Sequence, residues 1–180
     1  MTGASSKIFI IDASIARAAG PETSLHPTSK NCRDFLNEIR TVCHKMAWSP
    51  AIRAEWNVHK SGYAMNWLTS MYARKKIVLI EQKEDAKLRK DLNAAAKSDR
   101  DRAAMLKDVL LLEAAIQTDQ RIASLDDTVR KLFNSATSQH PALKKIIWVN
   151  PDHTNEATIE WLQTGAPSEP RRQLAVRGGI

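Results

Sequence analysis

The segment from Asp108 to Phe133 constrains the fold of this chain more than any other stretch. It opens with an acid followed by a run of apolar residues, 109–112, that face every side of a helix and therefore predict a largely buried element. A short predicted strand, residues 121–124, follows, and Asp126 comes directly after it. Because open α/β sheets bind ligands at the carboxyl ends of their strands, the segment predicts an α/β fold with acids at one edge of the sheet.

Asp108 is the acid that most needs a physical explanation. An ionised carboxylate on a buried helix is costly unless it is paired, hydrogen-bonded or bound to a metal ion. Asp126 is expected at the same place, so the two carboxylates could share a cation. Each also has a simpler explanation, since Asp108 could be a partly exposed acid near a basic partner and Asp126 with Asp127 could cap the next helix. The metal hypothesis therefore depends on whether other acids recur in similar positions.

A third acid follows the first predicted strand. The β-branched and aromatic run 7–11 predicts a buried strand, which ends at Asp12. Ser14 stands in the turn that leads into a stretch of small helical residues. Taken alone, Asp12 could equally be the N-cap of that helix.

A fourth acid lies close to a predicted helix start. Residues 45–48 predict a second strand, and Ser49 followed by Pro50 is typical of a helix N-cap and first helical position. Glu55 falls in the second turn of this helix, whose amino end faces the same sheet edge as Asp12 and Asp126. Alone, Glu55 could be a solvated helix acid.

The remaining pattern predicts one main domain, residues 1–165, and a basic tail, residues 166–180, that we expect to be disordered. Between Arg74 and Lys107 charged residues dominate, and we interpret 74–98 as a charged helical insertion, with 77–80 as a short strand or a buried turn and Ser98 starting a new helix. The other expected elements are a helix over 29–43, a helix over 128–133, a strand over 144–149 and a last helix over 156–162.

Composition limits the classes of protein that this chain can belong to. Its 180 residues with 43% hydrophobic content suit one globular domain, and the formal net charge of +7 favours an anionic partner such as nucleic acid. No apolar run is long enough to cross a membrane, and we expect a cytoplasmic protein. Cys32 and Cys43 have no metal-binding spacing, so we expect two reduced thiols and no structural zinc.

In their order and contexts, Asp12, Glu55, Asp108 and Asp126 resemble the acids of the PIN-domain nucleases, which include the VapC-type toxins of bacterial toxin–antitoxin pairs. The strongest likeness is the block 108–126, which is similar to the family's acid, apolar helix, strand and Ser-x-Asp pattern. The likeness covers about residues 7–151. The charged region 74–98 and the segment after Asn150 depart from a compact VapC-type toxin.

The resemblance implies a three-layer sandwich, with a central parallel β-sheet flanked by helices and the acids at the carboxyl edge of the strands. It implies a metal-dependent endoribonuclease that hydrolyses RNA phosphodiester bonds with Mg²⁺ or Mn²⁺, hard cations that prefer carboxylate oxygens. The four acids would be catalytic and metal-binding. Ser14 and Ser124 would hydrogen-bond the ligands or the phosphate, although both could be ordinary turn hydroxyls. The implied partners are an RNA substrate, an antitoxin protein if this is a toxin, and a second copy in a homodimer.

Several neighbouring residues compete for these roles. Asp127 is an open alternative to Asp126 as the fourth acid. Glu113 lies about 140° around the helix from Asp108, so its side chain should point elsewhere, and Asp119 lies about 16 Å further along the axis. Within the charged region we predict RNA contacts from Lys87, Arg89 and Lys90, while a simple solvated helical face explains these residues equally well.

Other classes of protein also place an acid after the first strand. A phosphatase of the haloacid dehalogenase type needs a second acid two residues later, where Ser14 stands here. A response-regulator receiver needs a lysine at a later strand end, and no residue matches convincingly. The remaining alternative is a PIN-like module that binds RNA or a protein without cutting. Four clustered carboxylates would repel bound phosphates unless a metal neutralised them, which favours cleavage.

Overall fold

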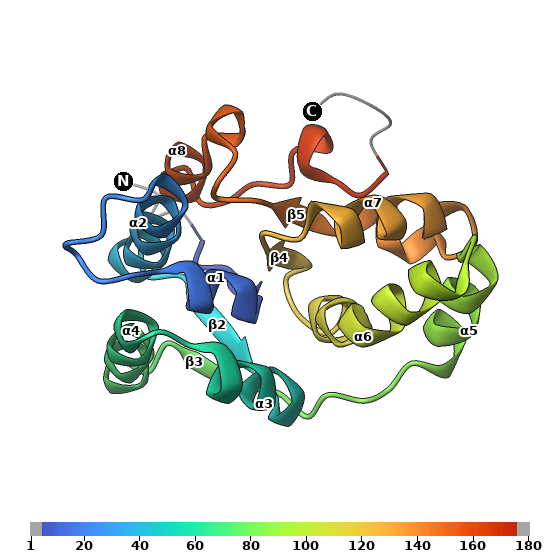
Figure 1. Cartoon of the computed structure of the whole chain (residues 1–180), viewed down its shortest axis with the longest axis horizontal. Helices are drawn as coiled ribbons and strands as arrows, with labels where there is room; N and C mark the ends of the chain where they lie inside the picture. The colour runs from blue at the N-terminus through green and yellow to red at the C-terminus, as the bar shows by residue number, and fades with distance from the viewer. Residues whose placement is uncertain (1–4, 176–180) are drawn as a thin grey trace.

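The computed structural model describes residues 5–175 and shows a five-stranded sheet flanked by helices (Figure 1). Every neighbouring pair of strands is parallel, and the order across the sheet is β3-β2-β1-β4-β5. The predicted α/β class with a central parallel sheet is confirmed. The strands are β1 (Ile8–Ile11), β2 (Lys45–Trp48), β3 (Ile77–Leu79), β4 (Arg121–Ala123) and β5 (Ile147–Val149).

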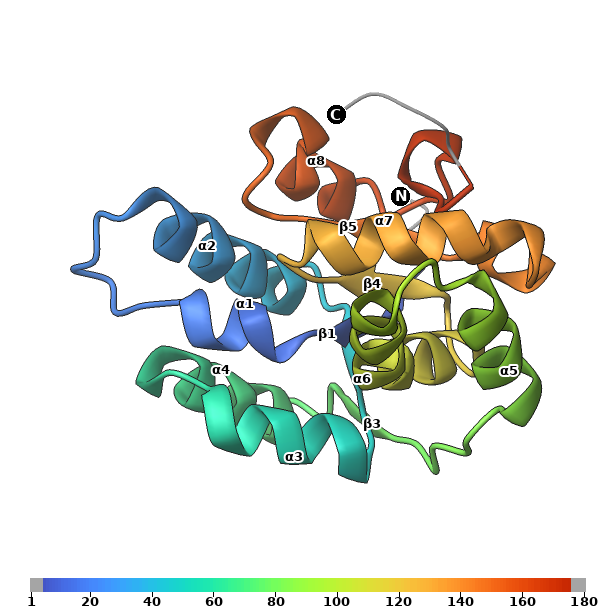
Figure 2. The same ribbon diagram turned by 45° about the vertical axis from the view of Figure 1, so that its right-hand side comes forward.

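Helices connect the strands because parallel neighbours need crossover connections. Figure 2 shows α1 between α2 and α3, and α6 packs on both β1 and β4. The α-helices are α1 (Ala13–Ala18), α2 (Pro27–Thr41), α3 (Pro50–His59), α4 (Gly62–Ala73), α5 (Ala86–Ala95), α6 (Asp99–Ile116), α7 (Asp127–Ser135) and α8 (Thr158–Gln163). Short 3₁₀ turns cover Ala136–Ser138, Pro141–Lys145, Thr154–Glu156 and Pro170–Arg172. Within the described residues, no helix combines the length and apolar character needed to cross a membrane.

Two serine caps confirm the predicted helix starts. The hydroxyl of Ser49 accepts a hydrogen bond from the amide of Ile52 at 3.2 Å, and Pro50 is the first residue of α3. Ser98 caps α6 in the same way through the amide of Asp101. Since α6 begins there, Asp108 lies in the middle of this helix, away from the helix ends whose backbone groups lack partners within the helix.

The two charged segments differ in how well they match the predictions. In region 74–98 the short-strand alternative is confirmed, since Ile77–Leu79 form the edge strand β3 before α5 begins, and the region is therefore only partly helical. The prediction of a disordered tail is wrong for residues 166–175, while 176–180 lie outside the described residues. Leu174 is buried and Gln173 bridges to Ile147 at the end of the sheet. The guanidinium of Arg172 stacks on Trp161 and pairs with Glu169, so a basic residue is buried with its charge compensated.

The strand order has its reversal at the centre of the sheet. β1 and β4 are hydrogen-bonded neighbours, with β2 and β3 following on one side and β5 on the other. The chain therefore leaves the carboxyl ends of β1 and β4 in opposite directions. In open α/β sheets this arrangement leaves a crevice that binds ligands.

Candidate acidic active site

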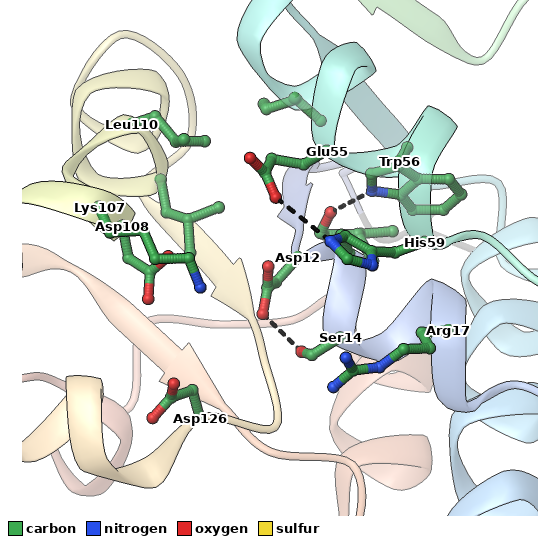
Figure 3. Close-up of a pocket in the computed structure, with 14 residues that line it drawn as sticks. Asp12, Ser14, Arg17, Glu55, Trp56, His59, Lys107, Asp108, Leu110 and Asp126 are labelled. Carbon is green, nitrogen blue, oxygen red and sulfur yellow. Dashed lines mark hydrogen bonds and ion pairs between the residues drawn. The ribbon is translucent and has the colours of Figure 1, made fainter. Parts of the chain in front are cut away.

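Four acids line a single pocket at this point of the sheet (Figure 3). Asp12 directly follows β1, Glu55 lies on α3, Asp108 lies on α6, and Asp126 is the N-cap residue of α7. The structure thus brings together four carboxylates that are widely separated in the sequence.

Hydrogen bonds hold Asp12 between the ends of β1 and β4. Its Oδ2 accepts hydrogen bonds from the hydroxyls of Ser14 and Ser124, the latter at 2.7 Å. The same hydroxyls accept from the amides of Leu125 and Asp126. Both serines therefore orient Asp12 and tie the two loops together, while within the described chain its Oδ1 has no hydrogen-bond partner and is available to a ligand.

The position of Glu55 is set by the packing of α3. Ile52 and Trp56 of α3 are buried in the core, and the indole nitrogen of Trp56 donates to the carbonyl of Ile11 at 2.8 Å. This hydrogen bond fixes the helix against the end of β1. Glu55 extends toward the pocket from the same helix, with His59 one turn later and 3.9 Å from its carboxylate.

Asp108 shows the electrostatic consequence of gathering the acids. Burial, which is the largest cause, and the negative charges of Asp12, Asp126 and Glu55 together raise the pKa of Asp108 to about 6, while the neighbouring Lys107 opposes this shift. Desolvation and like-charge repulsion both disfavour an ionised carboxylate. The direction of the shift agrees with the placement of the four carboxylates around one pocket.

Asp126 and Asp127 have different surroundings. Asp126 Oδ1 accepts from the amide of Val129 at 2.9 Å and caps α7, and the residue also lines the pocket. The capping explanation and the site hypothesis are thus compatible. Asp127 instead pairs with His153 at 2.9 Å and accepts from Asn150 at 3.1 Å, away from the other acids. Of the two, the structure places Asp126 beside the other three acids.

The two remaining acids of this region have structural roles. Glu113 is buried and accepts two hydrogen bonds from Arg89, at 2.7 and 3.0 Å, and one from the amide of Asp85. This pair joins α6 to α5. Asp119 accepts from the amide of Ile8 at 2.7 Å, at the start of β1 and thus at the opposite end of the sheet from Asp12.

None of the three basic residues predicted to contact RNA lines the acidic pocket. Lys87 pairs with Asp91 on the same helix, and Arg89 is engaged with Glu113. Lys90 is exposed on α5. These contacts account for Lys87 and Arg89 within the fold.

Three basic side chains also line the pocket and were missed by sequence reasoning, namely Arg17, His59 and Lys107. Helical spacing was the available signal, since Arg17 lies one turn after Ser14 and His59 one turn after Glu55. Figure 3 shows no ion pair between the acids and either Arg17 or Lys107. Both cations are therefore available to an anionic ligand at the rim of the pocket.

The donor set suits a hard divalent cation. Four carboxylates offer the oxygen ligands that Mg²⁺ and Mn²⁺ prefer, and a bound ion would relieve the repulsion between these like charges. As arranged in residues 5–175, no three His, Cys, Asp or Glu side chains form a ready-made metal-binding group. Metal binding would therefore require these side chains to move toward a shared ion.

Comparisons of the chain with protein-family models, with curated proteins and with solved structures found no match.

Proposed function

We propose that this protein is a metal-dependent endoribonuclease of the PIN type and that Asp12, Glu55, Asp108 and Asp126 form its catalytic centre. The observation that carries the proposal is the convergence of these four acids on one pocket at the reversal of the strand order. The net charge of +7 agrees with a polyanionic substrate. Positive charge elsewhere on the protein would attract the RNA backbone and offset its repulsion by the acidic pocket.

The four carboxylates would hold Mg²⁺ or Mn²⁺, which when bound lowers the pKa of a coordinated water and neutralises charge on the phosphate. Ser14 and Ser124 keep one oxygen of Asp12 occupied, so that the other is directed to the ligand. Asp126 is held by its cap hydrogen bond in a similar way. The chain's own contribution is thus a set of pre-oriented oxygens in a partly desolvated site, where electrostatic interactions are strong.

Arg17 and Lys107 would contribute to substrate binding. They reach the pocket from α1 and α6, so they lie on different elements around the acids. A phosphate chain crossing the pocket would meet a cation from each helix. Their positive charge would offset the repulsion between the RNA backbone and any carboxylate that the metal leaves unneutralised.

Cleavage of a mixed single-stranded RNA pool under Mg²⁺ or Mn²⁺ tests the proposal. Asp12→Asn and Asp108→Asn should each reduce cleavage by about a hundredfold or more, because each removes one charged oxygen with little change of shape. Asp127→Asn and Asp101→Asn are matched controls, the first beside Asp126 and the second on the same helix as Asp108. Equal activity of wild type and Asp12→Asn would show that a contaminating nuclease is responsible and would refute the assignment.

The second candidate is a PIN-like module that binds RNA or a protein without cutting. It is favoured by the finding that, within the described residues, the acids are not already arranged as a metal-binding group. The same RNA pool separates the two functions when metal is omitted and then restored. Binding without any metal-dependent cleavage would support the module and exclude the nuclease.

A further inference from the structure

The edge strand β3 leaves half of its backbone hydrogen-bonding groups unpaired. β3 pairs with β2 only, through a parallel register in which Val78 lies opposite Ala47. The carbonyl of Lys76 and the amide of Ile80 bond to β2, at 2.9 and 3.1 Å. Because backbone groups alternate along a strand, the amides and carbonyls of Ile77 and Leu79 face away from β2. They form an open template for another strand.

The side chains at this edge are unusually apolar for a solvent-exposed surface. Leu79 is 74% exposed at the end of β3. A groove beside the strand is lined by apolar residues that include Pro50, Leu79 and Ile80, together with polar ones such as Arg53 and Glu81. Natural proteins usually protect edge strands with charges or proline. Charged residues flank β3, but the strand itself, Ile77–Leu79, contains neither a charge nor a proline, and an exposed apolar side chain on such an edge indicates a binding surface.

The charges that flank β3 are ordered so that the edge complements itself. The strand is preceded by Arg74, Lys75 and Lys76 and followed by Glu81, Lys83 and Glu84. Lys75 and Glu81 are exposed, and neither forms an ion pair in the part of the chain that the structure describes. An identical strand laid antiparallel and centred on Val78 would bring Lys75 opposite the partner's Glu81, twice by symmetry, whereas a parallel copy would bring like charges together.

We propose that β3 pairs with β3 of a second copy of this chain, antiparallel and across a two-fold axis, so that two sheets become one. With Val78 near the axis, the outward groups of Ile77 lie opposite those of the partner's Leu79, and Lys75 lies opposite the partner's Glu81. Such an interface is isologous, since each contact occurs twice. The backbone of Lys75 is left-handed (φ 56°) and therefore does not continue the strand. Lys75 contributes to the interface through its side chain, and the intermolecular backbone hydrogen bonds are confined to β3.

This interface leaves the acidic pocket accessible. The pocket is at the carboxyl ends of β1 and β4, and β2 separates these strands from β3. The proposal is therefore independent of the proposed nuclease activity.

Sedimentation velocity of the full chain over a concentration range up to several hundred micromolar tests the pairing. Wild type should form a concentration-dependent dimer, and Leu79→Lys should weaken it by about tenfold or more, because a charge within an apolar edge strand opposes strand pairing. Leu25→Lys is the matched control, since Leu25 is 89% exposed in the loop between α1 and α2, outside β3 and its flanking residues, and it should leave the dimer unchanged. Equal melting temperatures would establish that both variants are folded.

A charge exchange tests the antiparallel arrangement separately. Lys75→Glu and Glu81→Lys should each weaken the dimer by several-fold, because each places like charges opposite one another twice, and the double variant should recover most of the wild-type affinity. A monomer at every concentration, a dimer insensitive to Leu79→Lys, or a double variant as weak as the single variants would each overturn the proposal.

Discussion

Replacing Asp108 by Asn should stabilise the metal-free protein at alkaline pH. In the folded chain, burial and the three other acids raise the pKa of Asp108 to about 6 from its ordinary value of 3.8. That difference corresponds to roughly 3 kcal/mol of unfavourable interaction once the group is ionised in both states. Since Asp108 is only half-buried, solvent screening reduces the expected gain to about 1 to 2 kcal/mol.

The sign of the pH dependence follows from the direction of the shift. Because the folded state binds the proton more tightly, the contribution of Asp108 to stability is fully present below pH 3.8 and is lost as the pH rises through about 6. The advantage of Asp108→Asn should therefore be complete near pH 8 and absent near pH 4. For a chain of this size, the gain corresponds to a rise in melting temperature of about 2 to 8 °C.

Thermal unfolding in EDTA at pH 4 and pH 8 measures this effect. Asp101→Asn on the same helix serves as control. It should give no gain in stability, because Asp101 lies in the first turn of α6, where the positive end of the helix dipole stabilises a negative charge. Adding Mg²⁺ or Mn²⁺ should raise the melting temperature of wild type and should do so less for Asp108→Asn, since a bound ion stabilises the folded state. An unchanged or lower melting temperature of Asp108→Asn at pH 8, or the same gain at pH 4, would refute the argument.

Three further changes test separate parts of the structure. Ser124→Ala removes a buried hydroxyl that orients Asp12, so RNA cleavage should fall about tenfold or more, and normal activity would contradict this role. Arg17→Gln should lower the slope of log affinity for RNA against log salt concentration, measured by filter binding, by about one phosphate contact, whereas an unchanged slope would place Arg17 outside the interface. Glu113→Ala should destabilise the fold by about 3 kcal/mol in urea unfolding, because it removes the buried partner of Arg89, and a loss below about 1 kcal/mol would contradict this.

Local patterns were sufficient to predict several of the strands and two of the helix starts. The apolar runs 8–11 and 45–48 form strands, and Ser49 and Ser98 cap helices as predicted. These features depend on neighbouring residues: side-chain alternation, helical period and a hydroxyl within reach of nearby amides. The order of the acids along the chain, together with the resemblance to PIN-domain nucleases, predicted the four acids that line the pocket.

Tertiary structure decided which polar residues are used internally. Arg89, predicted to contact RNA, is held by Glu113, and the basic tail packs through Arg172 on Trp161. Both contacts join residues whose pairing no local pattern shows. From composition alone, each of these charged residues is expected to be exposed to solvent. A buried charge needs a partner, and only the folded chain brings that partner into contact.

The choice between Asp126 and Asp127 shows the same division. From sequence alone the two adjacent carboxylates were equivalent. In the fold, Asp126 caps α7 at the pocket, while His153 and Asn150 engage Asp127 from the segment after β5. Sequence determined that acids would follow a strand end, because local periodicity sets where a strand stops. Only long-range packing decided which carboxylate faces the other acids, because that depends on the neighbouring groups that each side chain meets.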